Sequence, residues 1–370
     1  MLLMDKEHMV SSCVAVTREN GQKAIELLKS RDLINRELKV KRAGNEVLIP
    51  VINVEESLKV LASGSIDARE CVDEFTLIAK LTRRELLEKI EEMNGLKRLS
   101  YHLIGDILVI NLKGPEEAEK ARVTASVLMN HFKNIRSVYG KIGTFDEFRI
   151  PKLIHLGGEK DTFTIAKEYD LSFAVDIAKV FYNPRLADEH RRVSMEINNG
   201  SLVLDMFSGV GGFCIHVATS IKGEVHCNDI NPHAVSLLNI SVIMNTKKLL
   251  SPVYTWNLDA RGLPSRLKRK FDVIIMNHPT GSLDFIDVAD SLLKPGGKIY
   301  LYILGSKSED VVKEDVTGKL MEKNLSYSVE YKREVLEHSP SKSVHLLNLY
   351  KEKQGLDNDS PKEERQLAKQ

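Results

Sequence analysis

The chain has 370 residues, of which 42% are hydrophobic and 28% charged, and its formal net charge is +1. This length allows two or three domains, and no apolar run approaches the roughly 20 residues that a membrane helix needs. The near-neutral charge means that a nucleic-acid partner would have to be held by local basic patches and not by a global field. We expect a soluble protein, and the charged residues Asp5, Lys6 and Glu7 argue against a secretory signal and favour the cytoplasm.

The first 64 residues predict a small α/β domain. An apolar run at residues 13–16 is followed by a helical stretch at 22–31, and two short strands at 38–40 and 47–51 flank a turn at 43–45. The four cysteines, Cys13, Cys71, Cys214 and Cys227, are widely spaced and form no CxxC pair. We therefore expect buried, unpaired cysteines, with neither a disulfide framework nor a zinc site.

Residues 65–181 predict a second, α+β domain. Its expected elements are a helix at 83–93, a strand at 107–111, a helix at 116–131, and strand-like runs at 150–156 and 171–177.

From residue 182 to residue 352, apolar strands alternate with helical segments. This order predicts an α/β domain with a mainly parallel, doubly wound Rossmann-like sheet. The expected strands are 202–206, 224–227, 253–256, 273–276, 298–304 and 345–350. The remaining tail, 353–370, lacks an apolar face and is expected to be disordered.

A glycine-rich turn follows the first of these strands and includes Phe207, Gly209 and Gly211. Glycines allow the backbone to turn tightly and to approach a ligand closely. The turn lacks the GxGxxG spacing of pyrophosphate-binding loops. Asp205, just before the turn, suits an ammonium group. The pattern therefore favours S-adenosyl-L-methionine over a nicotinamide cofactor.

Acidic residues also follow the next two strands. Asp229, with Ile230 and Asn231, is placed to accept hydrogen bonds from ribose hydroxyls, and Asp259, with Ala260, is placed to meet the adenine amino group. Each of these residues also suits a helix N-cap or a solvated turn.

The fourth strand ends in Asn277, His278, Pro279 and Thr280. An asparagine close to a proline at a strand end resembles the Asn-Pro-Pro-Tyr motif of methyltransferases that act on base nitrogens. Such a turn is rigid and directs an amide at the edge of a planar substrate. The alternative is an ordinary turn capped by Asn277.

Residues 181–192, Phe-Tyr-Asn-Pro-Arg-Leu-Ala-Asp-Glu-His-Arg-Arg, resemble the signature of the archaeal-type tRNA (guanine-37 N1)-methyltransferase family. The similarity extends to residues 146–149 and 167–169, covers most of 75–350, and includes an N-terminal unit like the family's extra domain. It implies a class I methyltransferase domain, S-adenosyl-L-methionine as methyl donor, and a monomer that binds tRNA.

The resemblance also implies roles for individual residues. Guanine N1 carries a proton, so its methylation needs a base and a donor that stabilises charge on O6. The matching positions assign the base to Glu189 and the donor to Arg149, while Asn277 would hold the guanine edge. Arg185 precedes Glu189 by four residues and would share its helix face; the alternative is a surface ion pair between the two.

His278 and Thr280 depart from the family's usual pattern and leave open a second activity on a tricyclic wyosine precursor. A related aminocarboxypropyl transferase is an alternative, but it usually lacks the Arg-Leu-x-x-Glu signature and the N-terminal unit. A catalytically inactive tRNA-binding protein and a nicotinamide-dependent oxidoreductase are more distant alternatives.

Basic side chains are the candidates for gripping tRNA, and by resemblance the N-terminal unit would contact the outer corner of the tRNA. These basic candidates are Lys39, Lys41, Arg42, Arg83, Arg84, Arg191, Arg192, Arg266, Lys268, Arg269 and Lys270.

Overall fold

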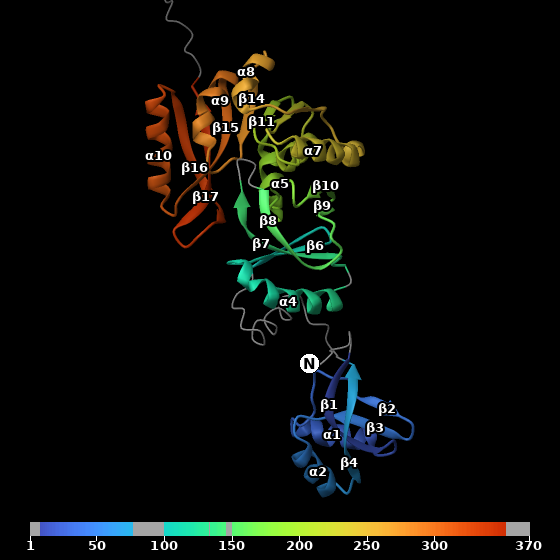
Figure 1. Ribbon diagram of the computed structural model, residues 1–370. Coiled ribbons are helices and arrows are strands. Elements are labelled where there is room, and N and C mark those ends of the chain that lie inside the picture. Colours follow the sequence, from blue (N-terminus) through green and yellow to red (C-terminus); the bar gives the residue numbers. More distant parts are fainter. Residues whose placement is uncertain (1–7, 77–99, 133, 146–149, 353–370) are drawn as a thin grey trace, which may run out of the picture. The chain divides into compact units, whose positions relative to one another are not determined.

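The computed structural model describes residues 8–76, 100–132, 134–145 and 150–352 (Figure 1). The chain divides into two compact units, the first formed by residues 1–100, 116–136 and 156–158 and the second by the rest. The helix expected at 83–93 and the tail 353–370 lie outside the described residues. Within the described part, no helix is both long and apolar enough to cross a membrane.

The N-terminal domain is a four-stranded antiparallel sheet with two helices against one face. Its elements are β1 (His8–Thr17), α1 (Gly21–Ser30), β2 (Lys41–Ala43), β3 (Glu46–Pro50), α2 (Val54–Ser63) and β4 (Ala68–Thr76). Val14 of β1 packs with Leu28 of α1 and Leu61 of α2. Because β4 pairs along β1, the domain reaches Thr76 and not only the expected residue 64.

The expectation of unpaired cysteines is wrong. The structure joins Cys13 to Cys71 and Cys214 to Cys227 as disulfides. Cys13 and Cys71 lie directly opposite each other in the β1–β4 register, 58 residues apart in sequence. Strand register and helix packing create such pairs, and the spacing of cysteines along the chain does not reveal them. Cys13, Cys214 and Cys227 are fully buried, as expected.

The next elements form a second four-stranded sheet and a hairpin. The sheet contains β5 (Tyr101–Ile104), β6 (Ile107–Asn111), β7 (Ser137–Phe145) and β8 (Ile150–Gly158), and the hairpin contains β9 (Phe163–Glu168) and β10 (Leu171–Asp176). The predicted helix at 116–131 is α4 (Ala118–His131).

The β9–β10 hairpin belongs to the Rossmann-like domain and not to the preceding α+β domain. Asn245 both accepts a hydrogen bond from the Ser172 amide (3.1 Å) and donates one to its carbonyl (2.7 Å), and Ser241 accepts from the Ala174 amide (2.9 Å). The boundary expected at residues 181 and 182 therefore moves to the start of β9.

The Rossmann-like domain is built on a seven-stranded sheet in the order β13-β12-β11-β14-β15-β17-β16. Its strands are β11 (Leu202–Asp205), β12 (Glu224–Asn228), β13 (Val253–Trp256), β14 (Phe271–Met276), β15 (Leu293–Ser306), β16 (Tyr327–Glu337) and β17 (Lys342–Lys351). The five strands from β13 to β15 are parallel, and β17 runs antiparallel to both neighbours.

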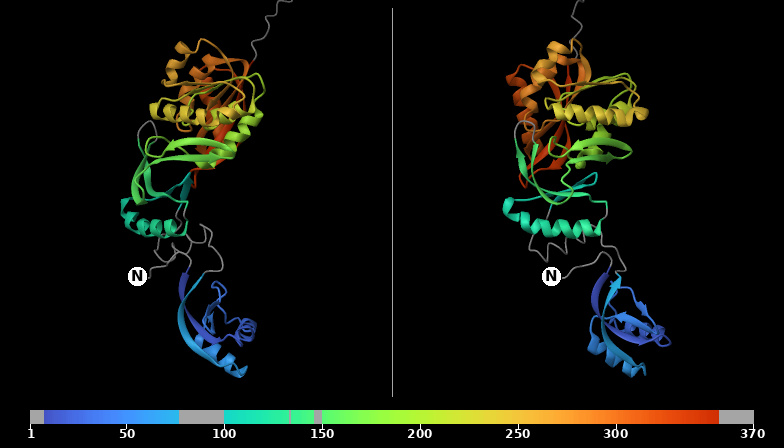
Figure 2. Two further views of the ribbon diagram at one scale, coloured as in Figure 1. Left: turned by 90° about the vertical axis from the view of Figure 1, so that its right-hand side faces the viewer. Right: turned by 45° about the vertical axis from the view of Figure 1, so that its right-hand side comes forward.

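Helices cover both faces of this sheet (Figures 1 and 2). One face packs against α5 (Ala187–Glu196), α6 (Gly212–Ser220) and α7 (Pro232–Asn245), and the other against α8 (Leu263–Arg266), α9 (Ile286–Leu292) and α10 (Glu309–Glu322). Central strands buried on both faces read as continuous apolar runs, which is why β11 and β14 were recognisable in the sequence. The doubly wound, Rossmann-like fold is confirmed.

Candidate active site

A cavity of about 600 Å³ lies where β11, β12 and β14 end. Successive strands are added on one side of β11 as far as β13 and then on its other side from β14, and such a switch point in strand order is where open α/β sheets bind ligands. The predicted site residues that line the cavity are Arg185, Phe207, Gly209, Asp229, Ile230, Asn231, Asp259, Ala260 and Asn277. Thus residues from five separate segments, 92 positions apart at the extremes, come together at this cavity.

The glycine-rich turn connects β11 to α6. Gly209 and Gly211 have φ angles of +53° and +98°, a region that side chains disfavour. A Cβ on Gly211 would also lie 2.3 Å from Cδ1 of Leu238. Gly211 does not line the cavity; its left-handed backbone instead begins α6 and so shapes the turn.

Asp229 joins the turns that follow β11 and β12. Its carboxylate accepts hydrogen bonds from the amides of Gly209 (2.7 Å) and Asn231 (2.9 Å). Burial raises the pKa of Asp229 above its ordinary value, and these two amide donors oppose the shift. Asp229 therefore both lines the cavity and holds the two neighbouring turns in place.

Asp205 lies behind the cavity wall and is not among the residues that line the cavity. Only 1% of its surface is exposed, and its carboxyl accepts a hydrogen bond from the Phe207 amide (3.2 Å). Burial raises the pKa of Asp205 to about 8, an effect that this amide bond opposes and the nearby Asp229 reinforces. At neutral pH it is therefore largely a neutral acid in the ligand-free protein.

The two other polar residues named at the strand ends are N-caps as well as cavity residues. Asn231 accepts from the amide of His233 (3.0 Å) at the start of α7. Asp259 accepts from the amide of Arg261 (2.9 Å) at the start of a 3₁₀ turn, Ala260–Gly262. Asn231 and Asp259 thus cap helical turns and also line the cavity, so the two interpretations of these residues are compatible.

The turn after β14 holds Asn277 at the cavity. The Leu304 amide donates to the Pro279 carbonyl (2.8 Å), and the amides of Gly281 and Ser282 donate to the His278 carbonyl (2.9 and 2.8 Å). The backbone is thus tied at several points, whereas the Asn277 side chain makes no hydrogen bond with any described residue. Its amide is available to a ligand.

Aromatic rings form part of the cavity lining near this turn. The Phe207 ring lies 5.2 Å from the rings of both His278 and Phe285. All three residues line the cavity, so a planar ligand group there would meet ring surfaces.

Glu189 is buried in α5 and does not line the cavity. It accepts hydrogen bonds from Arg192 (2.9 and 2.7 Å) and from the hydroxyl of Tyr302 (2.7 Å). Burial alone would raise the pKa of Glu189, but these donors lower it below its ordinary value. The alternative of an ion pair between Glu189 and Arg185 is not observed, and Arg185 lines the cavity. Arg149 lies outside the described residues.

The sequence profile of the TRM5/TYW2 methyltransferase domain matches residues 164–331. The N-terminal domain profiles of tRNA methyltransferase 5 and of TYW2 match residues 13–59 and 83–162. The tRNA (guanine(37)-N(1))-methyltransferase Trm5b of Methanocaldococcus jannaschii is 31% identical over 91% of this chain and 97% of its own length. The chain belongs to the TRM5/TYW2 methyltransferase family. This confirms the resemblance inferred from residues 181–192.

Two solved structures and one further relative are also similar to this chain. The structure described as a complex of aTrm5 and tRNALeu is 28% identical, with a TM-score of 0.68, over 92% of this chain and 99% of that one. The structure of M. jannaschii Trm5 in complex with adenosine is 25% identical, with a TM-score of 0.58, over 91% and 98%. The tRNA 4-demethylwyosine(37)-methyltransferase Taw21 of Saccharolobus solfataricus is 28% identical over 62% of this chain and 87% of its own length.

Several cavity residues of this methyltransferase were not singled out in the sequence. They are Lys141 of β7, Tyr182, His190 of α5 and Arg261. Tyr182 and His190 belong to the segment 181–192 that carried the family resemblance, and both line the cavity. Lys141 is contributed by the preceding sheet, and no local pattern indicates it.

Three of the proposed tRNA-gripping residues form ion pairs. Arg192 pairs with Glu189 and Glu196, Arg269 with Glu224 (2.6 Å), and Lys41 with Asp73 (2.8 Å). The side chains of Lys39, Arg42, Arg266 and Lys268 are exposed, and Arg83 and Arg84 lie outside the described residues. The methyltransferase therefore uses part of its predicted basic surface for internal ion pairs.

Proposed function

We propose that this methyltransferase transfers a methyl group from S-adenosyl-L-methionine to N1 of guanine 37 in tRNA. The observation that carries the proposal is the composition of the cavity. The cavity is lined by residues of the turn after β11, such as Phe207 and Gly209, and by Asn277 of the turn after β14; the Asn277 side chain has no hydrogen-bond partner among the described residues. A methyl donor and a heteroatom-bearing base would meet between these two turns.

The proposed cofactor contacts come from the strand-end residues. Asp229 suits the ribose hydroxyls, and Ile230 beside it is 40% exposed and offers an apolar surface to the adenine. Asp259 and Ala260 suit the adenine edge, and Asp205 would compensate the cofactor's ammonium group from behind the wall. Bound there, the cofactor supplies an activated methyl group on a sulfonium. The similarity to the adenosine-bound neighbour supports a cofactor that contains adenosine.

The remaining residues would act on guanine. Asn277 would hold the base edge, Arg149 would stabilise charge on O6, and Arg185 would contribute positive charge at the cavity. Glu189 would accept the N1 proton. Because its oxygens are bound by Arg192 and Tyr302, this role requires Glu189 to exchange its Arg192 contact for N1 when tRNA binds.

The tRNA itself would be bound by both units of the chain, with the N-terminal domain contacting the tRNA far from the anticodon. The complex of a relative with tRNALeu supports tRNA as the substrate. We also propose that the chain acts as a cytoplasmic monomer.

The test is incubation of the protein with unmodified tRNA transcripts and labelled cofactor, followed by nucleoside mass spectrometry. We expect 1-methylguanosine at position 37, and none in a matched transcript with adenosine 37. An aminocarboxypropyl product, or a methyl group at another position, would refute the proposal.

A second activity is favoured by His278 and Thr280 and by the similarity to Taw21. It is methylation of 4-demethylwyosine at the same tRNA position. Incubation with tRNA carrying this tricyclic base, under the same conditions, distinguishes a bifunctional enzyme from one restricted to guanine.

A further inference from the structure

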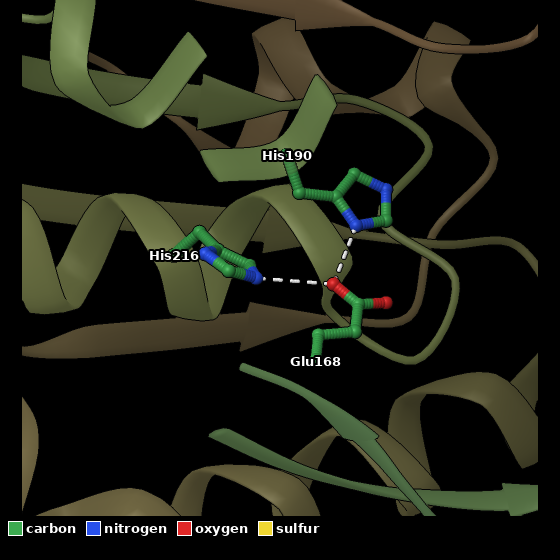
Figure 3. Close-up of side chains that lie close together, drawn as sticks. All are labelled: Glu168, His190 and His216. Atoms are coloured by element: carbon green, nitrogen blue, oxygen red, sulfur yellow. Dashed lines mark hydrogen bonds and ion pairs between the residues drawn. The ribbon is translucent and has the colours of Figure 1, made fainter. Parts of the chain in front are cut away.

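A buried carboxylate collects three hydrogen bonds beside the cavity. Glu168, at the end of β9, is 2% exposed. Its Oε2 accepts from Nδ1 of His190 (2.8 Å) and from Nε2 of His216 (3.0 Å), and its Oε1 accepts from the hydroxyl of Tyr182 (2.8 Å). Figure 3 shows both imidazoles directed at the same oxygen. One side chain thus joins β9, α5, α6 and the segment preceding α5.

Two kinds of chemistry fit a Glu-His-His group. The three ligand atoms lie within 4.8 Å of one another, and zinc binds such a set. However, both oxygens of Glu168 already accept hydrogen bonds at normal distances, so the buried charge is satisfied without an ion. Burial raises the pKa of Glu168, but the two histidine donors lower it to about 2, which keeps it ionised. We therefore interpret the group as a hydrogen-bond network.

The network supports the cavity from behind. Tyr182 and His190 line the cavity, whereas Glu168 and His216 do not. The His190 ring occupies the space in front of α6: a Cβ on Gly212 would lie 2.3 Å from its Cε1, and the Phe213 ring centroid lies 4.5 Å from its own. The position of the ring therefore depends on Glu168.

The same network connects α5, which carries Glu189, with α6, which follows the glycine-rich turn. His190 is adjacent in sequence to Glu189 on α5, and His216 lies one turn after Gly212 on α6. Since both histidines bind one oxygen atom, Glu168 links α5 to α6, in addition to the direct hydrogen bond from Ser220 to Ser194 (3.0 Å).

We propose that Glu168 is a positioning residue for methyl transfer: through His190, His216 and Tyr182 it holds α5 and the cofactor turn in register. This inference rests on the proposed function. It assigns no contact with substrate to Glu168 or His216. Their effect on the rate passes through the residues that line the cavity.

The test is a pair of variants at His216. Glutamine places an N–H donor close to the position of Nε2, whereas methionine has a similar volume and no donor. We expect His216→Met to lower the single-turnover rate at saturating tRNA by about ten- to hundredfold and His216→Gln by only about threefold, since small misplacements have large kinetic effects. S-adenosyl-L-methionine affinity, measured by calorimetry without tRNA, should fall in the same order. Equal rates and affinities in the two variants would overturn the proposal.

Substitutions of Glu168 separate positioning from metal binding. In Glu168→Gln the amide oxygen can still accept from both histidines, while the amide nitrogen donates to the Tyr182 hydroxyl oxygen, so the variant should keep most of the activity that Glu168→Ala loses. If Glu168→Gln and Glu168→Ala both lose activity and the purified wild-type protein contains stoichiometric zinc, the group is a metal site and not a hydrogen-bond network.

Failure of the proposed function is distinguishable from failure of this inference. If wild-type protein methylates no guanine 37, the proposed function fails. The order of cofactor affinities in the two His216 variants still decides the role of Glu168.

Discussion

Glu189 is held as an ionised carboxylate whose oxygens are engaged by Arg192 and Tyr302. A general base must be ionised, and the lowered pKa of Glu189 meets that requirement at any pH near neutrality. The same donors make it a weaker proton acceptor while they stay in place. Exchange of the Arg192 contact for guanine N1 would therefore both free the oxygen and raise its basicity.

Replacing the base should slow methyl transfer and leave cofactor binding intact. Glu189→Gln keeps the size of the side chain but cannot accept a proton, so we expect its single-turnover rate to fall by about 10²–10⁴-fold. S-adenosyl-L-methionine affinity should be nearly unchanged, because Glu189 does not line the cavity. The wild-type rate should rise with pH until the base is ionised in the tRNA complex, and this limb should be lost or displaced in the variant.

Glu196→Gln is the matched control for this variant. Glu196 also pairs with Arg192 from the same helix, but it lies further from the cavity-lining end of α5. Its substitution should leave the single-turnover rate close to wild type. If Glu189→Gln turns over within about threefold of wild type throughout, the base lies elsewhere.

Asp205 should make the stability of the ligand-free protein depend on pH. The folded protein keeps this proton up to about pH 8, whereas the unfolded chain releases it near its ordinary value of about 3.9. The folded state therefore binds more protons in this range, and the Asp205 contribution to the free energy of unfolding falls as pH rises through it. Asp205→Asn resembles the neutral acid and should remove this component, as measured by urea unfolding at several pH values.

The same variant tests the proposed compensation of the cofactor's ammonium charge. The positive ligand would lower the pKa of Asp205 and ionise it, and Asp205→Asn cannot supply this charge, so S-adenosyl-L-methionine binding should weaken about ten- to hundredfold. Unchanged affinity would limit Asp205 to shaping the turn through its bond with the Phe207 amide.

At the scale of elements, the start of α6 requires glycine at position 212. A Cβ on Gly212 would overlap the His190 ring, and the ring cannot move away without breaking its hydrogen bond to Glu168. Gly212→Ala should therefore weaken cofactor binding and lower the thermal midpoint. Gly318→Ala in α10 is the control, because a Cβ there meets nothing within 4 Å. It should stabilise the protein by about 0.5–1 kcal/mol.

The sequence predicted those elements whose patterns are local. The buried strands β11 and β14 are continuous apolar runs, and Phe207, Gly209 and Asn277, which follow them, line one cavity. The edge strand β16 was missed because charged residues alternate along it and it buries little surface. β9 was missed because two of its three buried side chains, Thr164 and Glu168, are polar, so the strand shows no apolar alternation.

Side-chain directions within the site were harder to predict than its location. Helical spacing suggested a pair between Arg185 and Glu189, but Arg185 belongs to a preceding 3₁₀ turn, Pro184–Leu186, so the two residues do not share one helix face. Arg192, one turn later, takes the partner role. The cluster around Glu168 has partners 14, 22 and 48 residues away, and no spacing rule identifies it.

At the scale of the whole molecule, the chain combines a domain that builds the cavity with an N-terminal domain that has its own core. Val14, Leu28 and Leu61 close that core, and none of its members is a cavity residue. The N-terminal domain ends with β4, whose whole length pairs with β1. A truncation at residue 60 would cut α2 and leave β4 without its partner, so removal of residues 1–76 is the cleaner experiment.

Deleting residues 1–76 should separate tRNA binding from chemistry. The cavity and all described residues proposed for catalysis remain, so cofactor affinity and the single-turnover rate at saturating tRNA should stay close to wild type. If the N-terminal domain contacts the tRNA far from the anticodon, KM for whole tRNA should rise, since lost remote binding acts on ground state and transition state alike. An anticodon stem-loop lacks the outer corner, so full-length and truncated protein should use it equally well. Loss of single-turnover chemistry on saturating tRNA would instead show that the N-terminal domain takes part in assembling the active site.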